Sequence, residues 1–238
     1  MFYTRYGNPT HTVAEKAIAE LEGADAALLF ASGMNAITTS ILSLLKSGDH
    51  VVAQRDIYGG ATKFFSQWLP KFGIETTFVD TVEYDQHARA IRPNTKLLYL
   101  ESPTNPTLRV VDLRQATALA RQHNLITLID STFATPINQR PADFGIDLIM
   151  HSGTKYFAGH SDLICGIVAG RQELIQKIHE TRTTLGGTVD HPRAWLLRPP
   201  GRVGFTPERR SKLWFEIMRG RGSWFKMLAA APDDPSLH

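Results

Sequence analysis

Lys155 stands in a setting where an amine could act as a nucleophile. It follows the apolar run Leu148-Ile-Met150, which is typical of a buried strand, and the segment His151-Ser-Gly-Thr154 separates the two. A free ammonium carries a large desolvation cost in a protein core, so this lysine must reach water, find an anion or be held neutral. A neutral lysine amine can form a Schiff base with a carbonyl group. The simpler interpretation, a lysine that leaves a strand end for solvent, applies to most lysines in such a position.

Hydroxyl and amide groups beside this lysine could hold a phosphate. The hydroxyls of Ser152 and Thr154 flank the amide of Gly153, and a second set of amides begins a predicted helix at Ser32-Gly-Met-Asn35. Backbone amides at a helix start favour an anion. On pattern alone, a plain strand-to-helix turn at residues 32–35 is an equally good interpretation. An amine next to a phosphate site is what pyridoxal phosphate requires.

Three further residues suit the other parts of this cofactor. A carboxylate paired with the pyridine nitrogen keeps that nitrogen protonated, so that the ring acts as an electron sink, and Asp130 at the end of an apolar segment is well placed for this. Tyr58 can cover the ring, and Asn105 can contact the ring hydroxyl. Each residue alone has an ordinary alternative, as a helix cap, a core aromatic or a turn residue. Together these alternatives require independent coincidences, so the sequence favours the cofactor.

The elements that must position these residues alternate regularly along the chain. Strands that are apolar on both faces alternate with helices, which is typical of an α/β fold with a mostly parallel seven-stranded sheet and helices on both faces. Ligands of such sheets bind at the carboxyl ends of strands, where Tyr58, Glu101, Asp130, Ser152, Thr154 and Lys155 lie. The predicted strands cover residues 26–30, 51–53, 76–79, 96–101, 126–130, 147–152 and 164–169. The predicted helices cover residues 12–22, with Thr12 opening a capping box, and about 35–46, 61–72, 84–91, 113–123 and 172–184.

Other chemistries match the sequence less well. Ser152-Gly-Thr-Lys155 has the S-x-x-K spacing of serine β-lactamases and penicillin-binding proteins, but that motif needs a helix and a later K-T-G, and the K-T-G is missing. The histidines show no spacing typical of a metal site, so we expect no metal. Cys165, the one cysteine, excludes an internal disulfide and fits a reducing cytoplasm. We expect a cytoplasmic protein, because no apolar run is long enough to span a membrane and no signal-peptide pattern follows Met1.

The composition changes sharply near residue 190. Residues 191–238 carry nine Lys/Arg against four Asp/Glu, whereas residues 1–190 carry 17 basic and 19 acidic groups. We predict an N-terminal arm over residues 1–12, a cofactor-binding large domain over 13–190, and an atypical basic tail over 191–238 that is out of frame, truncated or disordered. A tail that binds nucleic acid is the alternative, which we disfavour because its charges do not line one face of a recognisable motif. We expect neither nucleic acid nor a membrane as partner.

Short motifs carry a resemblance to a known family. In chain order they are Tyr3-Thr-Arg-Tyr-Gly-Asn-Pro-Thr10, Leu21-Glu-Gly23, Ala31-Ser-Gly-Met34, Tyr58-Gly-Gly60, Glu101-Ser-Pro-Thr-Asn-Pro106, Ile129-Asp-Ser-Thr-Phe133, His151-Ser-Gly-Thr-Lys-Tyr156 and Gly159-His-Ser-Asp162. Together they resemble the Cys/Met-metabolism, or trans-sulfuration, family of pyridoxal-phosphate enzymes, of the cystathionine γ-synthase and γ-lyase type. The resemblance implies the large domain of a fold-type I pyridoxal-phosphate transferase. It ends near Asp190, so we expect the family's C-terminal small domain, which supplies the arginine that grips the substrate carboxylate, to be missing.

The resemblance also implies roles for the site residues. Lys155 binds the cofactor through its amine and later moves the Cα proton of the substrate. Tyr58 stacks on the ring and acts as acid or base near the leaving group. Asp130 pairs with the pyridinium nitrogen, while Asn105 contacts the ring hydroxyl and Glu101 supports that contact.

The resemblance assigns the phosphate to groups from two subunits. Within one subunit the ligands are the amides of Gly33 and Met34 and the side chains of Ser152 and Thr154. Tyr3 and Arg5 of the arm reach the phosphate of a neighbouring subunit, which implies a homodimer or homotetramer with shared active sites.

The choice of reaction rests on the residues after the stacking tyrosine. Tyr58-Gly-Gly60 is closer to cystathionine γ-synthases, γ-lyases and homoserine sulfhydrylases than to bacterial β-lyases, and methionine γ-lyases tend to carry a cysteine in place of Gly60. The first expectation is therefore γ-replacement or γ-elimination on a sulfur amino acid or an O-acyl homoserine. The alternatives are methionine γ-lyase or homoserine sulfhydrylase activity, and an inactive truncated chain that only binds the cofactor.

Overall fold

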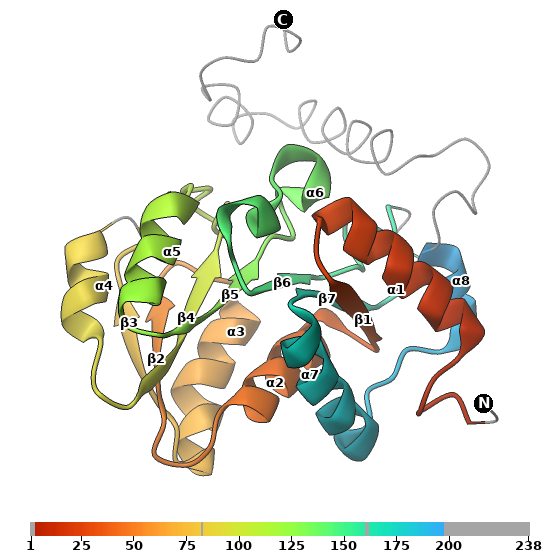
Figure 1. Ribbon diagram of the computed structural model, residues 1–238, viewed down its shortest axis with the longest axis horizontal. Coiled ribbons are helices and arrows are strands. Elements are labelled where there is room, and N and C mark those ends of the chain that lie inside the picture. Colours follow the sequence, from red (N-terminus) through yellow and green to blue (C-terminus); the bar gives the residue numbers. More distant parts are fainter. Residues whose placement is uncertain (1–2, 82, 160–161, 198–238) are drawn as a thin grey trace, which may run out of the picture.

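A seven-stranded sheet forms the centre of the protein (Figure 1). The structure is a computed structural model and describes residues 3–81, 83–159 and 162–197. The strand order is β1-β7-β6-β5-β4-β2-β3, and β7 is antiparallel to both of its neighbours, while the other pairs are parallel. This confirms the predicted mostly parallel sheet. The strands are β1 (Ala26–Phe30), β2 (His50–Gln54), β3 (Glu75–Val79), β4 (Thr95–Glu101), β5 (Ile126–Asp130), β6 (Leu148–His151) and β7 (Gly166–Gly170).

Helices cover both faces of the sheet, as predicted (Figure 1). On one face α2, α7 and the segment from Gly59 to Phe72 enclose a core that includes Phe30, Phe65 and Tyr99. On the other face α1 and α8 pack against β1 and β7, and α5 packs over β4 and β5. The α-helices are α1 (Pro9–Glu22), α2 (Gly33–Leu44), α3 (Gly59–Lys63), α4 (Tyr84–Ala90), α5 (Leu113–Gln122), α6 (Thr135–Asn138), α7 (Gln172–Leu185) and α8 (His191–Leu197).

The first helix begins earlier than the capping box at Thr12 predicts. Asn8 is the cap, and its side-chain oxygen accepts a 2.9 Å hydrogen bond from the Thr10 backbone N–H. Pro9 occupies the first helical position, where its fixed φ suits the helix and its missing N–H costs nothing. The helix ends as predicted at Gly23, whose φ of 66° is left-handed.

The predicted helix over residues 61–72 is three shorter segments. α3 continues into a π-helical turn, Phe64–Trp68, and then into a 3₁₀ turn, Leu69–Phe72. The Leu69 backbone N–H donates to the Phe64 carbonyl, five residues back, as a π turn requires. Pro70 has no N–H with which to continue an α-helical pattern, which explains why the prediction of one continuous helix was wrong.

Three short segments were not predicted as helical at all. They are α6, the 3₁₀ turn Pro141–Phe144, and α8, which the sequence places inside the atypical tail. α8 packs against α1 with Ala194 and Leu197 buried. Residues 191–197 are thus continuous with the body, whereas residues 198–238 lie outside the described residues, and the prediction for them stays a prediction.

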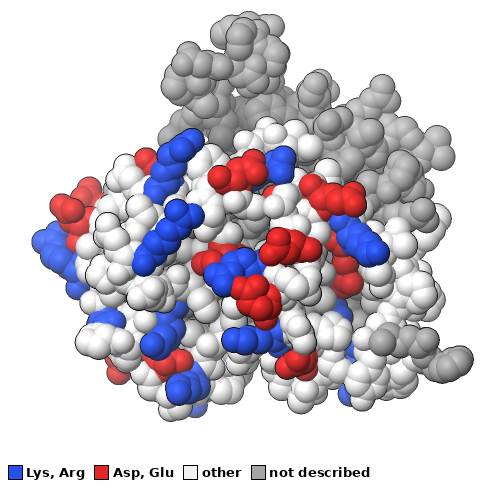
Figure 2. All heavy atoms as spheres, viewed as in Figure 1, with Lys and Arg blue, Asp and Glu red and all other residues white. Residues whose placement is uncertain are grey.

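The sheet brings the ends of its parallel strands to one edge. β2, β3, β4, β5 and β6 all finish there, and β1 runs in the same direction because it and β6 are both antiparallel to β7. On the face of the molecule in Figure 2, acidic and basic side chains are interspersed, in keeping with the near-neutral charge of residues 1–190. Within the described ranges, every helix is too short or too polar to cross a lipid bilayer.

Candidate active site

Glu101 joins two loops at the carboxyl edge of the sheet. Its Oε2 atom accepts a 2.7 Å hydrogen bond from the Tyr58 backbone N–H, and its Oε1 atom accepts one of the same length from the Asn105 backbone N–H. The carboxylate is buried, and Gln54 fixes its backbone by accepting from the Glu101 N–H at 2.5 Å. The backbones of two predicted site residues, Tyr58 and Asn105, are therefore hydrogen-bonded to a third, Glu101.

Asp130 lies beside Glu101 in register across β4 and β5. Its Oδ1 atom accepts a 2.9 Å hydrogen bond from the Thr132 backbone N–H. The Thr132 hydroxyl in turn accepts a 2.8 Å hydrogen bond from the Ser152 backbone N–H. Thr132 thus links Asp130 at the end of β5 to the segment that follows β6, a role that the sequence alone did not reveal.

Burial disfavours the ionised form of both neighbouring carboxyls, and Asp130 further disfavours the ionised form of Glu101. Burial, and after it the proximity of Asp130, raises the pKa of Glu101 to about 9, although the hydrogen bonds from Tyr58 and Asn105 act in the opposite direction. Burial also raises the pKa of Asp130, against hydrogen bonds from Thr132 that lower it. A cation placed beside this pair would favour its ionised form.

The start of α2 lies against Ser152. A Cβ atom built on Gly33 would be 3.1 Å from the Ser152 Cβ and 3.2 Å from its Oγ. Ser32 caps the helix by accepting a 3.1 Å hydrogen bond from the Asn35 N–H. The amides of Gly33 and Met34 are in the first turn, where no carbonyl of the helix can accept from them. Amides and a hydroxyl from two distant segments therefore meet, as a phosphate site requires.

Tyr58 lies over the start of α3. A Cβ atom on Gly60 would be 2.5 Å from the tyrosine Cε1 and 3.0 Å from the Met34 Sδ. The tyrosine is 45% exposed. The absence of a side chain at residue 60 therefore sets how close the ring can come to α3 and to Met34.

Lys155 is carried on a tight turn. Its backbone N–H donates to the Ser152 carbonyl at 3.0 Å, and its side chain is exposed. Thr154 anchors the turn to the residue before β7, because its hydroxyl accepts a 3.1 Å hydrogen bond from the Cys165 N–H and lies 3.2 Å from the Cys165 carbonyl oxygen. Whether the Thr154 hydroxyl also reaches a phosphate stays a prediction. Of the residues that follow, His160 and Ser161 lie outside the described residues.

A buried pair that the sequence did not reveal lies behind this turn. The Nε2 atom of His151 is 2.5 Å from the Glu22 Oε1 atom, and both side chains are fully buried. The pair ties the last turn of α1 to the residue just before Ser152. The two residues are 129 positions apart, and no local pattern marks such a contact.

The arm residues Tyr3 and Arg5 are not part of this assembly. Both are exposed, and the Arg5 guanidinium lies 5.2 Å from the centre of the Tyr3 ring and 5.1 Å from that of Tyr6. Their predicted role at a neighbouring subunit stays a prediction.

A cavity of about 620 Å³ lies at the opposite edge of the sheet. Its lining includes Gly23, Asp25, Asp147 and Arg171, which belong to the amino ends of parallel strands and the end of β7. None of the predicted site residues lines it. Chemistry that parallel strands support at their carboxyl ends is not expected there.

The groups at the carboxyl edge match the parts of pyridoxal phosphate in kind. The buried carboxyl of Asp130 suits a pyridinium nitrogen, the amides at the start of α2 with Ser152 suit a phosphate, and the Lys155 amine suits an aldehyde. Among the described residues, neither lysine nor arginine forms an ion pair with Asp130. A protonated ring nitrogen would supply that counter-charge, so the residues fit the cofactor.

Comparison with known proteins defines the class to which this fold and site belong. Residues 1–199 match the family described as "Cys/Met metabolism PLP-dependent enzyme". The chain belongs to this family, whose members depend on pyridoxal phosphate, and the resemblance inferred from the sequence is confirmed.

Two curated relatives come from Bacillus subtilis (strain 168). Cystathionine beta-lyase MetC is 42% identical over 196 residues, covering 82% of this chain and 50% of the relative. Cystathionine gamma-lyase is also 42% identical over 196 residues, covering 82% of this chain and 52% of the relative. The chain thus spans about half the length of the curated relatives it matches.

A solved structure shares the fold. The crystal structure of metB from Corynebacterium glutamicum superposes with a TM-score of 0.81 at 34% identity, covering 90% of this chain and 53% of that chain. This confirms the predicted fold class.

Proposed function

We propose that this chain forms the cofactor-holding large domain of a trans-sulfuration enzyme that catalyses γ-replacement or γ-elimination on a sulfur amino acid or an O-acyl homoserine. The observation that carries the proposal is the Glu101 carboxylate, which holds the Tyr58 and Asn105 loops next to Asp130. The turn of Lys155 begins at the same edge of the sheet. These are the residues that the chemistry needs, and they come from four different strand ends.

Each residue has a defined task in the proposed reaction. When bound, pyridoxal phosphate withdraws electrons from the substrate Cα and makes its proton acidic. The Lys155 amine would hold the aldehyde of the cofactor and would take the Cα proton of the substrate. The Asp130 carboxylate holds the proton on the ring nitrogen. The Tyr58 hydroxyl, on a half-exposed ring, exchanges a proton with the group that leaves or enters at Cγ.

Gly60 supports the choice of a γ reaction. Because a Cβ atom there would be 2.5 Å from the Tyr58 ring, the size of residue 60 controls where this acid–base group lies. The Tyr58-Gly-Gly60 sequence is the feature by which the chain resembles γ-synthases and γ-lyases.

β-Elimination of cystathionine is the second candidate. The relatives support it as well as they support γ-elimination, because a cystathionine beta-lyase and a cystathionine gamma-lyase match this chain at the same 42% identity. A third candidate is that residues 1–238 bind the cofactor without turnover.

Product analysis with cystathionine separates these possibilities. The purified chain is reconstituted with pyridoxal phosphate, and the thiol and keto acid released are identified by mass spectrometry. γ-Elimination yields cysteine and 2-oxobutyrate, whereas β-elimination yields homocysteine and pyruvate. Methionine and O-acyl homoserines with a thiol acceptor are tested in parallel. Cofactor binding without any product identifies the inactive chain, and no cofactor binding at all contradicts the proposal.

We also propose that active sites are shared in a homodimer or homotetramer in the cytoplasm. The support is the exposure of Tyr3 and Arg5 and, for the compartment, the single buried thiol of Cys165. Subunit complementation tests the sharing. Arg5→Ala and Lys155→Ala should each lack activity alone, and mixed oligomers should regain it, because one site then contains both intact residues. No regain in verified mixed oligomers contradicts sharing.

A further inference from the structure

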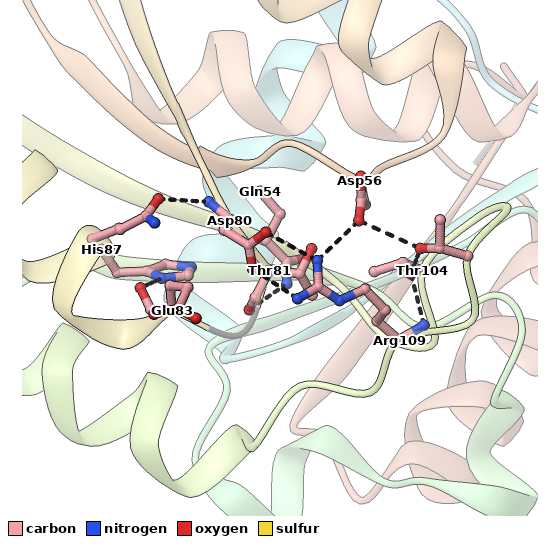
Figure 3. Close-up of polar contacts among 10 residues, drawn as sticks. Gln54, Asp56, Asp80, Thr81, Glu83, His87, Thr104 and Arg109 are labelled. Carbon is pink, nitrogen blue, oxygen red and sulfur yellow. Dashed lines mark hydrogen bonds and ion pairs between the residues drawn. The ribbon is translucent and has the colours of Figure 1, made fainter.

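Arg109 binds two acidic residues that follow neighbouring strands. Its Nη1 atom lies 3.2 Å from the Asp56 Oδ2 and 3.1 Å from the Asp80 Oδ2, and its Nη2 atom lies 2.8 Å from the Asp80 Oδ1 (Figure 3). Asp56 follows β2, Asp80 follows β3, and Arg109 is in the connection after β4. One guanidinium therefore joins three strand ends.

Arg109 is itself fastened to the segment that carries Asn105. The Arg109 backbone N–H donates to the Thr104 hydroxyl at 2.9 Å (Figure 3). The Thr104 N–H donates to the Arg109 carbonyl at 3.0 Å. The Leu108 N–H also donates to the Thr104 carbonyl at 2.8 Å. These hydrogen bonds close residues 104–109 into a loop, so a shift of Arg109 would also shift Asn105.

On the other segment, Asp56 precedes Tyr58 by only two residues, so the position of one constrains the position of the other. The Tyr58 and Asn105 segments are thus joined on two sides, and on the solvent side the Thr107 hydroxyl also lies 3.5 Å from the Asp56 Oδ2 atom. On the buried side the two segments are joined by hydrogen bonds to the Glu101 carboxylate. On the solvent side they are joined by the Arg109–Asp56 ion pair, which we call the outer joint. Side-chain exposures of 32% for Arg109 and 31% for Asp56 show that this outer joint is only partly buried.

We propose that Arg109 is a positioning residue, which through Asp56 and Asp80 holds Tyr58 and Asn105 at the spacing that the cofactor ring requires. The inference rests on the proposed function for its purpose, but the joint itself exists without the cofactor. Arg109 touches none of the proposed reacting groups. A partly exposed ion pair adds little to global stability, so the effect of losing it should be local.

The test compares Arg109→Gln with a matched surface pair. Arg92 binds Glu75 at the other end of β3, 2.6 Å apart and well exposed, so Arg92→Gln removes a similar ion pair far from the site. The first measurement is amide hydrogen exchange of the chain without cofactor, followed by mass spectrometry of fragments containing residues 55–60 and 102–111. In Arg109→Gln these fragments should exchange about tenfold faster, with the rest of the chain unchanged. Arg92→Gln should leave them as in wild type.

The second measurement is the dissociation constant for pyridoxal phosphate, from titration by absorbance. Arg109→Gln should bind about tenfold more weakly, and Arg109→Lys should recover part of the loss because lysine keeps the charge but not the forked geometry. Asp56→Asn, which leaves the Asp80 pair intact, should shift both measurements in the same direction by less. It keeps the proposal testable if Arg109→Gln fails to fold.

Wild-type exchange and affinity in both Arg109→Gln and Asp56→Asn would overturn the proposal, and so would an equal loss in Arg92→Gln. If the exchange results are as expected but no form of the chain binds pyridoxal phosphate, Arg109 does hold the two segments in place, and the proposed function is wrong.

Discussion

The Glu101 carboxylate accepts a 2.7 Å hydrogen bond from the backbone N–H of Tyr58, a residue 43 positions earlier in the chain. Its other oxygen accepts from the Asn105 N–H at the same distance. This buried side chain therefore helps to set the separation between the residue proposed to stack on the cofactor ring and the residue proposed to contact its hydroxyl. We therefore expect Glu101 to support the site and not to take part in the reaction.

Glu101→Gln should loosen one of the two loops. Glutamine retains one acceptor oxygen, but its amide nitrogen can only donate, so either Tyr58 or Asn105 loses its partner. We expect the dissociation constant for pyridoxal phosphate to rise about tenfold, measured by titration. Glu75→Gln, an exposed change at the start of β3, is the control and should have no effect. Equal affinity in Glu101→Gln and wild type would show that the Glu101 carboxylate is not needed to hold the Tyr58 and Asn105 loops in place.

The same residue should make the stability of the cofactor-free chain depend on pH. The pKa of Glu101 is raised to about 9 in the folded chain from an ordinary value of 4.5, so above pH 4.5 the folded chain holds a proton that the unfolded chain has released. This contribution to the free energy of unfolding is complete below pH 4.5 and is lost as the pH rises toward 9. Between these two pH values, one such proton makes the free energy of unfolding fall by about 1.4 kcal/mol per pH unit.

Urea unfolding of the cofactor-free chain at several pH values measures this loss. Glu101→Gln should show a shallower decline between neutral and alkaline pH than wild type. Parallel declines in the two proteins would mean that Glu101 ionises normally in the folded state.

Two adjacent glycines should respond differently to the same change. Nothing lies within 4 Å of a Cβ atom built on Gly59, so Gly59→Ala should stabilise the chain by about 0.5–1 kcal/mol without affecting turnover. Gly60→Ala must displace the Tyr58 ring and should reduce kcat by roughly 10²-fold, because a displaced acid–base group transfers protons poorly. Steady-state kinetics and thermal unfolding of the two variants provide the comparison. A Gly60→Ala enzyme with normal kcat would show that residue 60 does not control where the Tyr58 hydroxyl lies.

The buried pair of Glu22 and His151 should matter for stability. Glu22→Ala leaves the histidine without its partner in the core, and breaking a buried pair in this way costs about 3–5 kcal/mol. Glu22→Gln retains an acceptor and should cost less. Glu20→Ala, on the exposed side of α1, is the control, and urea unfolding is the measurement. A Glu22→Ala chain as stable as the control would mean that the pair contributes nothing to the attachment of α1.

The strands and the edge that carries the site could be predicted because both leave local signals. Runs such as Leu128-Ile129 are apolar on both faces, and a polar residue such as Asp130 then marks the strand end. Parallel strands place such ends together by topology alone. The start of α1 was harder, because Asn8-Pro9 and Thr12 with Glu15 are competing start signals, and proline at the first helical position decided in favour of Asn8.

The contacts that connect the site could not be predicted. Thr132 joins Asp130 to Ser152, and Arg109 joins Asp56 to Asp80, through side chains whose partners are far away in the sequence. A threonine or an arginine in a loop has many possible partners, and only the folded sheet determines which one it meets.

The central claim is that the Lys155 amine binds the cofactor aldehyde. The direct measurement is borohydride reduction of the chain after incubation with pyridoxal phosphate, followed by protease digestion and mass spectrometry of every lysine-containing peptide. We expect a stable phosphopyridoxyl group on Lys155 at one equivalent per chain, and none on this peptide in Lys155→Ala. Labelling that is spread over other lysines, or that is equally strong in Lys155→Ala, would contradict it.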